Sequence, residues 1–223
     1  MKYLLLQHWD HPDRLGELEK LSKDNMMKYA KQCGADYQLI TGTPFHPSLS
    51  APCQKCHMIS EEFDVYDVVV MTDLDMFTVP GIQENIFETT GYGRHYGIQE
   101  ILVKGLKRRF PRLGDPSRPY WGGSTYRMPL DLRKRLRKHV REEEIIQFHN
   151  NLEDEGIFHR LAVLAKIPVD KDTYFDKDVW NRSSFEPELS GANFIHIRPK
   201  VTPKGPKRPK IENYRELVRK GIL

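Results

Sequence analysis

Short apolar runs alternate with longer stretches of helical spacing through the first third of the chain. The pattern predicts strands at residues 3–6, 37–41 and 65–71, with helices at residues 14–32 and 53–63 between them. Asp13 is placed to cap the first helix, which we expect to end near Cys33 and Gly34. The run at 65–71 is the most apolar and β-prone of the chain, which is typical of a central parallel strand covered on both faces.

The second half of the chain has a more mixed pattern. It predicts strands at residues 95–100, 123–127 and 192–197, and helices at residues 130–140, 153–166 and 213–220. Strands that alternate with helices indicate an α/β fold, here a mostly parallel central sheet flanked by helices. We expect a single Rossmann-like domain over residues 1–204, followed by a basic C-terminal arm and short helix at 205–223.

The composition is that of an ordinary globular domain. Hydrophobic residues make up 39% and charged residues 30% of the 223 positions, which leaves enough apolar material for a core. The apolar stretches are shorter than the roughly 18–20 residues of a membrane span, and the opening run is too short for a signal peptide. We therefore expect a cytoplasmic protein with no membrane span. Cys53 and Cys56 lack the second cysteine pair that a zinc site would need.

Positive charge is concentrated in two segments, although the net charge is only +4. Residues 104–141 carry 13 Lys and Arg against two Asp, and residues 198–220 carry nine against two Glu. Such segments suit nucleic acid, an anionic membrane surface or a phosphorylated small molecule. Along residues 133–141 the charges lie all round the expected helix, so we interpret that stretch as a solvated face.

The most informative motif follows the apolar run at 65–71. Asp73 and Asp75 come just beyond the carboxyl end of this predicted strand, where open α/β sheets bind their ligands. Carboxylates two residues apart in extended chain point to the same side. Two such oxygen ligands suit Mn²⁺ or Mg²⁺, and either ion can take up charge as a nucleoside diphosphate departs from its sugar.

The Asp-x-Asp tripeptide alone is a weak signal, because chance supplies about one in a chain with this many aspartates. Two further examples occur, at 170–172 and 176–178. Neither follows an apolar strand, so we interpret both as solvated loop charges. Position after a strand therefore singles out Asp73 and Asp75.

A histidine near the end of the chain is a candidate third ligand. His196 lies in the strand predicted at 192–197, and Arg198, Lys200 and Lys204 follow it. An imidazole at this strand end would favour Mn²⁺, and the basic residues would neutralise a diphosphate. The alternative is a surface histidine beside a basic tail.

Four segments together resemble the GT-A glycosyltransferases, and the resemblance spans residues 3–204. They are the metal motif at 68–75, an acceptor-side strand at 121–125, an acidic helix start at 151–158 and the strand with the third ligand at 194–196. Many retaining members carry His-x-x-Gly-x-x-Lys after the last strand. The present chain departs from that pattern, so Lys200 or Lys204 would have to substitute for its lysine.

The resemblance implies a metal-dependent transferase that uses a nucleotide sugar, with a UDP-sugar as the favoured donor and a glycan or glycoprotein as acceptor. The cofactor would be Mn²⁺ or Mg²⁺, held by Asp73, Asp75 and His196, with Asp73 also near the ribose. The donor would further contact Gln7, His8, Trp9, Asp10, Arg14, Lys55, Lys200 and Lys204. The chain also resembles viral members that act on capsid glycans, which implies action in the host cytoplasm.

Asp154 and Glu155 stand at the start of the helix predicted at 153–166. In an inverting enzyme one of them would accept the proton of the acceptor hydroxyl. In a retaining enzyme one would stabilise positive charge on the sugar ring. The alternative is that both only favour the N-terminus of a helix. The family resemblance favours a catalytic role, and the choice between the two residues stays open.

Two other classes of function fit parts of the pattern. A metal-dependent nucleotidyltransferase would also use paired carboxylates, but it would carry a glycine-rich basic loop near the first strand, unlike residues 7–14. A nucleic-acid-binding domain would account for the basic segments. Phe110 and Tyr120 lie near the first of them, but no binding module is recognisable.

Overall fold

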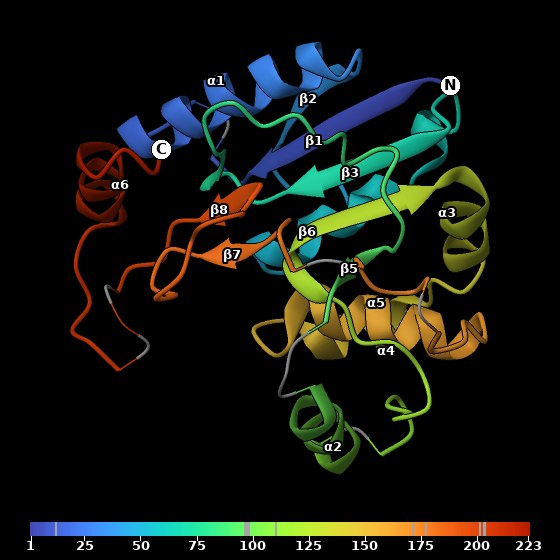
Figure 1. Cartoon of the computed structure of the whole chain (residues 1–223). Coiled ribbons are helices and arrows are strands. Elements are labelled where there is room, and N and C mark those ends of the chain that lie inside the picture. Colours follow the sequence, from blue (N-terminus) through green and yellow to red (C-terminus); the bar gives the residue numbers. More distant parts are fainter. Residues whose placement is uncertain are drawn as a thin grey trace.

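In this computed structural model the described residues are 1–11, 13–95, 99–109, 111–170, 172–176, 178–200, 202 and 204–223. Figure 1 shows a central sheet flanked by helices. Its strands, in order across the sheet, are β2 (Asp36–Thr41), β1 (Tyr3–Trp9), β3 (Val68–Thr72), β6 (Gly122–Pro129) and β5 (Gly93–Arg94). β1 pairs in parallel with β2 and β3, whereas β6 runs antiparallel to β3 and β5. Four of the five strands therefore point the same way, which confirms the predicted mostly parallel sheet.

Helices cover both faces of this sheet. α1 (Glu17–Gln32) lies on one face, and the 3₁₀ segment η1 (Ala51–Ile59), α3 (Leu130–Arg137) and α5 (Glu153–Leu164) lie on the other. The remaining helical segments are η2 (Glu61–Phe63), α2 (Gln99–Arg109), α4 (Glu142–Ile145), η3 (Ile146–Phe148) and α6 (Lys210–Arg219). Among the described residues, no helix has the length and apolarity that crossing a bilayer requires.

Burial on both faces explains the continuous apolar run of β3. Val69 and Met71 pack into the core beneath η1, α3 and α5, while Val68 and Val70 pack into the core beneath α1. All the residues of this strand are buried, so a period-two alternation of apolar and polar positions is not required.

A second, smaller sheet lies beside the first. Its order is β4 (Met76–Thr78), β8 (Phe194–His196) and β7 (Arg182–Ser183), with β4 antiparallel and β7 parallel to β8. Figure 1 shows α6 next to this sheet, near one end of α1. Leu217 of α6 packs there with apolar residues of α1, β4 and β8. The predicted boundary between domain and arm at residue 204 stays a prediction.

Two predicted helix boundaries are wrong. α1 begins at Glu17 with Gly16 at the cap position, so Asp13 lies outside the helix. The indole of Trp9 instead binds the carbonyl of Arg14, at 3.1 Å, before the helix starts. The helix predicted at 53–63 is two 3₁₀ segments, because Ser60 adopts an extended conformation between them.

Two further predictions from the second half are also wrong. Gln99 is the first residue of α2, not part of a strand over 95–100, and residues 96–98 lie outside the described residues. Val103 and Leu106 are buried at helical spacing in α2. Arg133 of α3 is fully buried rather than solvated, because its guanidinium donates to backbone carbonyls that precede β3.

Candidate active site at the end of strand β3

The turn after β3 brings three candidate metal ligands together. β3 ends at Thr72, and the chain reverses into β4, with the amide of Met76 bonded to the carbonyl of Asp73 at 3.3 Å. Because β4 pairs with β8 in a register that sets Met76 opposite His196, Asp75 lies beside that histidine. One ligand atom each from Asp73, Asp75 and His196 lies within 4.8 Å of the others, which is close enough for a single cation.

A serine on the central sheet orients the imidazole of His196. Nδ1 of His196 lies 2.5 Å from Oγ of Ser124 on β6. Its Nε2 lies 3.0 Å from Oδ1 of Asp75 and 3.7 Å from Oδ2 of Asp73. When Nδ1 donates its proton to the serine, the Nε2 lone pair faces the two carboxylates. An outer hydrogen bond of this kind fixes the tautomer of a metal-binding histidine.

The residues present fit a divalent cation. The 3.0 Å contact between Asp75 and His196 lacks hydrogen-bond geometry, and within the described part of the chain this buried Oδ1 has no hydrogen-bond partner. A buried carboxylate oxygen without a partner is costly unless something binds it. Two carboxylates and an imidazole suit Mn²⁺, and an oxygen-rich set completed by phosphate oxygens suits Mg²⁺.

Each carboxylate of the triad also contacts a lysine. Nζ of Lys55 lies 2.6 Å from Oδ1 of Asp73, and Nζ of Lys210 contacts Oδ2 of Asp75. Burial raises the pKa of Asp75, but His196 and Lys210 outweigh that effect and hold the pKa well below its usual range. Both carboxylates are therefore balanced by ammonium groups of the chain itself.

Lys55 extends this charge network to α5. Its ammonium lies 2.8 Å from Oδ2 of Asp154 and donates to the carbonyl of Gly123 at 2.6 Å. Burial lowers the pKa of Lys55, yet Asp154 and Asp73 more than offset it, so the pKa lies above the usual value and the lysine stays charged. The hydroxyl of Tyr126 donates to the same Oδ2 of Asp154 at 2.8 Å.

Asp154 has the raised pKa expected of a general base. Burial raises its pKa to about 7; Lys55 opposes the shift, and the nearby charges of Glu155 and Asp73 add to it. A base that titrates near neutral pH can take a proton from a substrate at physiological pH. The position of Asp154, at the start of a helix and in a cleft, supports a functional interpretation.

Glu155 is held by two hydrogen-bond donors, one from β6 and one from the segment just before it. Its Oε1 accepts the amide of Gly123 at 2.8 Å, and its Oε2 accepts the hydroxyl of Tyr120 at 2.9 Å. Burial raises the pKa of Glu155, while these two hydrogen bonds lower it. A Cβ atom at Gly123 would lie 2.9 Å from Oδ2 of Asp154 and from Oε1 of Glu155, so only glycine leaves room for both carboxylates.

The backbone is strained immediately before these carboxylates. Asn150, Leu152 and Glu153 have positive φ angles of 52°, 60° and 45°. Such angles in residues other than glycine cost about 1–3 kcal/mol each and concentrate at functional sites. The strained turn sets the direction in which α5 presents Asp154 and Glu155.

One cleft of about 390 Å³ is lined by the metal triad together with Lys55, Asp154 and Glu155. The predicted residues that line it are His8, Trp9, Asp10, Lys55, Asp73, Asp75, Asp154, Glu155 and His196. Of the other lining residues, the sequence analysis did not single out Glu19 and Lys210. It placed Arg198 beside the diphosphate, and Gly123, Ser124 and Glu153 lie in segments that carry the GT-A resemblance. Among the described residues, the buried Nε of Arg198 has no hydrogen-bond acceptor.

The other residues that we expected to contact the nucleotide sugar do not line this cleft. Gln7 is buried beneath the cleft, where its amide nitrogen donates to the carbonyl of Asp73 at 2.9 Å. Arg14 lies before α1, with its carbonyl bound by the Trp9 indole. Lys200 lines a different cavity, and Lys204 is exposed.

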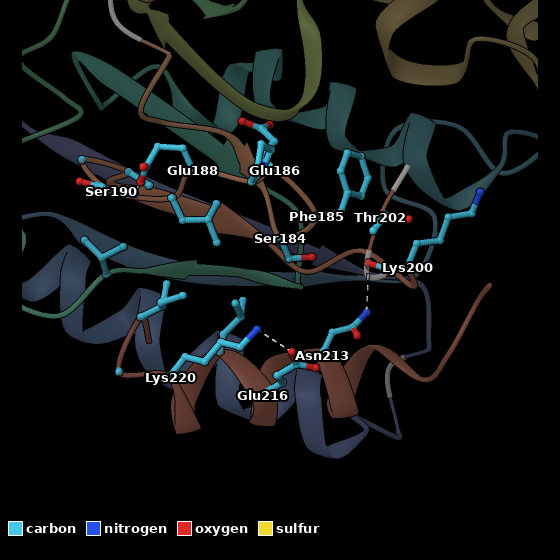
Figure 2. A pocket seen from close by; sticks show the side chains of 18 of the residues that line it. Ser184, Phe185, Glu186, Glu188, Ser190, Lys200, Thr202, Asn213, Glu216 and Lys220 are labelled. Atoms are coloured by element: carbon cyan, nitrogen blue, oxygen red, sulfur yellow. Dashed lines mark hydrogen bonds and ion pairs between the residues drawn. The ribbon is translucent and has the colours of Figure 1, made fainter. Parts of the chain in front are cut away.

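That second cavity, of about 710 Å³, lies between α6 and the segment that follows β7. Figure 2 shows Glu186 and Glu188 on one side and Asn213, Glu216 and Lys220 of α6 on the other. Glu216 pairs with Lys220 at 2.6 Å, and the charge of Glu186 is balanced by arginines. This cavity is larger than the cleft, but the metal triad lies in the cleft.

No protein-family model matches the chain, and no curated protein sequence matches it. Among solved structures, the chain is similar to a glycosyltransferase involved in the glycosylation of the major capsid of PBCV-1. The two chains are 13% identical and superpose with a TM-score of 0.54, over 98% of this chain and 100% of the other. The likeness concerns the fold, and it confirms the GT-A-like α/β architecture that the sequence predicts.

Proposed function

We propose that the protein is a metal-dependent glycosyltransferase that moves a sugar from a nucleoside-diphosphate sugar to an acceptor hydroxyl. The observation that carries the proposal is the Asp73, Asp75 and His196 triad, set in one cleft with Asp154 and Glu155. Its fold is shared with a glycosyltransferase over nearly the whole chain. Metal-dependent sugar transfer uses a cation at the departing diphosphate, and a base can accept the proton of the acceptor hydroxyl; the cleft contains candidates for both.

The proposed cofactor is Mn²⁺ or Mg²⁺, held by the triad. When bound, the cation supplies positive charge that stabilises the departing diphosphate. Ser124 keeps the ring of His196 turned toward the carboxylates, and Lys55 holds Asp73 in place from the other side.

We assign the nucleoside to the part of the cleft that His8, Trp9 and Asp10 line, with uridine as the proposed base and Asp73 near the ribose. The indole of Trp9 is fixed by its bond to the carbonyl of Arg14, which prepares a flat surface for stacking. For the diphosphate, Arg198 and Lys210 are better placed than Lys200 or Lys204, because both line the cleft.

In the proposed reaction the bond between the anomeric carbon and the diphosphate oxygen breaks, and the acceptor oxygen forms a new bond to that carbon. The electron pair of the broken bond leaves on the diphosphate. Asp154 is our candidate for the carboxylate that faces the reacting centre, because its raised pKa fits a proton acceptor. Both oxygens of Glu155 already accept hydrogen bonds from the protein, so we assign Glu155 to positioning.

For the acceptor we propose a hydroxyl of a glycan, carried by a glycoprotein. The structurally similar protein takes part in capsid glycosylation, which favours this class of acceptor. A viral protein that acts in the host cytoplasm would fit the same likeness.

Donor hydrolysis tests this proposal. The purified protein is incubated with UDP-glucose, UDP-galactose and other nucleotide sugars, before and after chelation with EDTA, and the release of nucleoside diphosphate is measured. We expect release that EDTA abolishes and Mn²⁺ restores. Asp75→Ala should lose it while keeping nearly the thermal stability of the parent. Metal-dependent turnover retained in that variant would exclude the proposed site.

A further inference from the structure

The pairing of Asp75 with Lys210 links the metal site to the C-terminal helix. Lys210 is the first residue of α6, and its ammonium contacts Oδ2 of Asp75. The other oxygen of Asp75 faces His196, at 3.0 Å. A lysine of α6 thus occupies one side of a carboxylate that the proposed function assigns to a cation.

Each aspartate of the triad has a lysine as a partner. Asp73 has the ammonium of Lys55 at 2.6 Å, and Asp75 has that of Lys210. A divalent cation bound to the same carboxylates would add two positive charges within a few ångströms of both lysines. Like charges at such distances in a half-buried site repel strongly. Metal binding therefore favours the departure of one ammonium.

The two lysines differ in their freedom to leave. The side chain of Lys55 is 8% exposed and is held by Asp73, Asp154 and the carbonyl of Gly123. The side chain of Lys210 is 39% exposed and contacts Asp75 from the first position of a helix. Withdrawal of Lys55 would leave Asp154 buried without its cation, whereas Lys210 can turn toward solvent or toward an incoming diphosphate.

Helix α6 packs against the small sheet and α1 on one side and borders a cavity on the other. Its buried residues are Asn213 and Leu217, and an exposed ion pair joins Arg215 to Glu17 of α1. The cavity of about 710 Å³ borders Asn213 and Leu217. In Figure 2 the amide of Asn213 meets the backbone of Lys200 at the edge of this cavity, and Glu216 pairs with Lys220. Helix α6 is packed on one side through Leu217 and Tyr214, and the contact of Lys210 with Asp75 is an additional attachment at its first turn.

We propose that Lys210 and the divalent cation are alternative partners of Asp75, so that metal binding breaks this pair and frees the first turn of α6. The inference rests on the proposed metal site. In the absence of metal, the ion pair of Lys210 and Asp75, which we call the latch, attaches α6 to the turn after β3. When metal takes Asp75, the released ammonium becomes available to a diphosphate, which couples donor binding to metal binding.

Calorimetric titration with Mn²⁺ alone tests the competition. Three proteins are compared: the parent, Lys210→Met, and the control Lys220→Met, which removes an ammonium at the other end of α6. We expect Lys210→Met to bind Mn²⁺ about tenfold more tightly, within the usual range of coupling between two ligands. The control should match the parent. Equal or weaker binding by Lys210→Met would overturn the proposal.

Hydrogen exchange provides a readout independent of affinity. Saturating Mn²⁺ should increase amide exchange in peptides that cover α6 of the parent, and change little in Lys210→Met, where the latch is already absent. If none of the three proteins binds Mn²⁺, both the metal site and the latch are wrong. If all three bind it equally and α6 exchange is unchanged, the metal site stands and only the latch is wrong.

Discussion

Lys55 and Asp154 form a buried ion pair in which Nζ lies 2.8 Å from Oδ2 of the carboxylate. The same nitrogen lies 2.6 Å from Oδ1 of Asp73, so one ammonium joins the candidate metal site to the candidate catalytic carboxylate. Lys55 belongs to η1 and Asp154 to α5, two segments that pack on the same face of the central sheet. The pair therefore fixes the distance between the two halves of the site.

Replacement of Lys55 by Met should destabilise the protein strongly. The substitution leaves two carboxylates with no ammonium between them, and removal of one partner from a buried pair costs about 3–5 kcal/mol. Urea unfolding of Lys55→Met should show that loss relative to the control Lys28→Met, which removes an exposed lysine of α1. A loss no greater than that of the control would contradict the buried network.

The activity should depend on the ionisation of Asp154. Burial raises the pKa of Asp154 to about 7. The charge of Lys55 lowers this pKa, whereas the charges of Glu155 and Asp73 raise it further. The hydroxyl of Tyr126 donates a hydrogen bond to the same carboxylate. Because a proton acceptor must be deprotonated, kcat/KM should rise as pH increases through about 7 and then level off. Asp154→Asn should lose most activity together with this pH dependence. A profile of the parent that is flat between about pH 6 and 8 would argue against Asp154 as the base.

The same shift has a consequence for stability. The folded protein holds the proton of Asp154 more tightly than the unfolded chain, whose aspartates titrate near about 3.9. Protonation of Asp154 therefore adds to the free energy of unfolding at low pH, and this contribution is lost as pH rises through about 7. Direct titration of the Asp154 carboxyl carbon by NMR would measure this pKa, and a value near that of an ordinary aspartate would contradict both expectations.

Alanine at position 123 should disturb both carboxylates. Its Cβ would lie 2.9 Å from Oδ2 of Asp154 and from Oε1 of Glu155, so at least one side chain must move. We expect kcat to fall about tenfold or more, with a stability cost of about 1–3 kcal/mol from overpacking. Gly105→Ala is the matched control, because a Cβ there meets no atom within 4 Å in the described part of the chain. Wild-type kcat in Gly123→Ala would mean that these carboxylates do not act at the reacting centre.

The hydroxyl of Ser124 should matter for metal affinity. It lies 2.5 Å from Nδ1 of His196, and loss of such an outer hydrogen bond lowers metal affinity by about 10–100-fold. Mn²⁺ titration of Ser124→Ala, beside the control Ser190→Ala in the other cavity, measures the effect. If the affinity of Ser124→Ala equals that of the control, Ser124 does not orient His196 for metal binding.

The centre of the fold was predictable because its pattern is local. A strand buried on both faces must be apolar throughout, and β3 is such a strand. The two aspartates that follow it, at 73 and 75, are placed by that strand alone. His196 was also identified from its strand, although its contact with Asp75 depends on the register between β4 and β8.

The contribution of Lys210 was not predictable from the sequence. Segment 198–220 holds nine basic residues, and the choice among them is made by the packing of α6 against α1, β4 and β8. Lys200 and Lys204 follow His196 closely in sequence, but they are not among the residues that line the cleft. The role of Arg133 was also misjudged, since the carbonyls that it binds come from the segment before β3.

Calorimetric titration with UDP, with and without Mn²⁺, tests the central claim most directly. The proteins compared are the parent, Asp75→Asn, and Asp172→Asn as a control from another Asp-x-Asp tripeptide. We predict that the parent and the control bind UDP tightly only when Mn²⁺ is present, and that Asp75→Asn loses this binding. Mn²⁺-dependent binding of UDP that survives in Asp75→Asn would contradict the proposed nucleotide-sugar site.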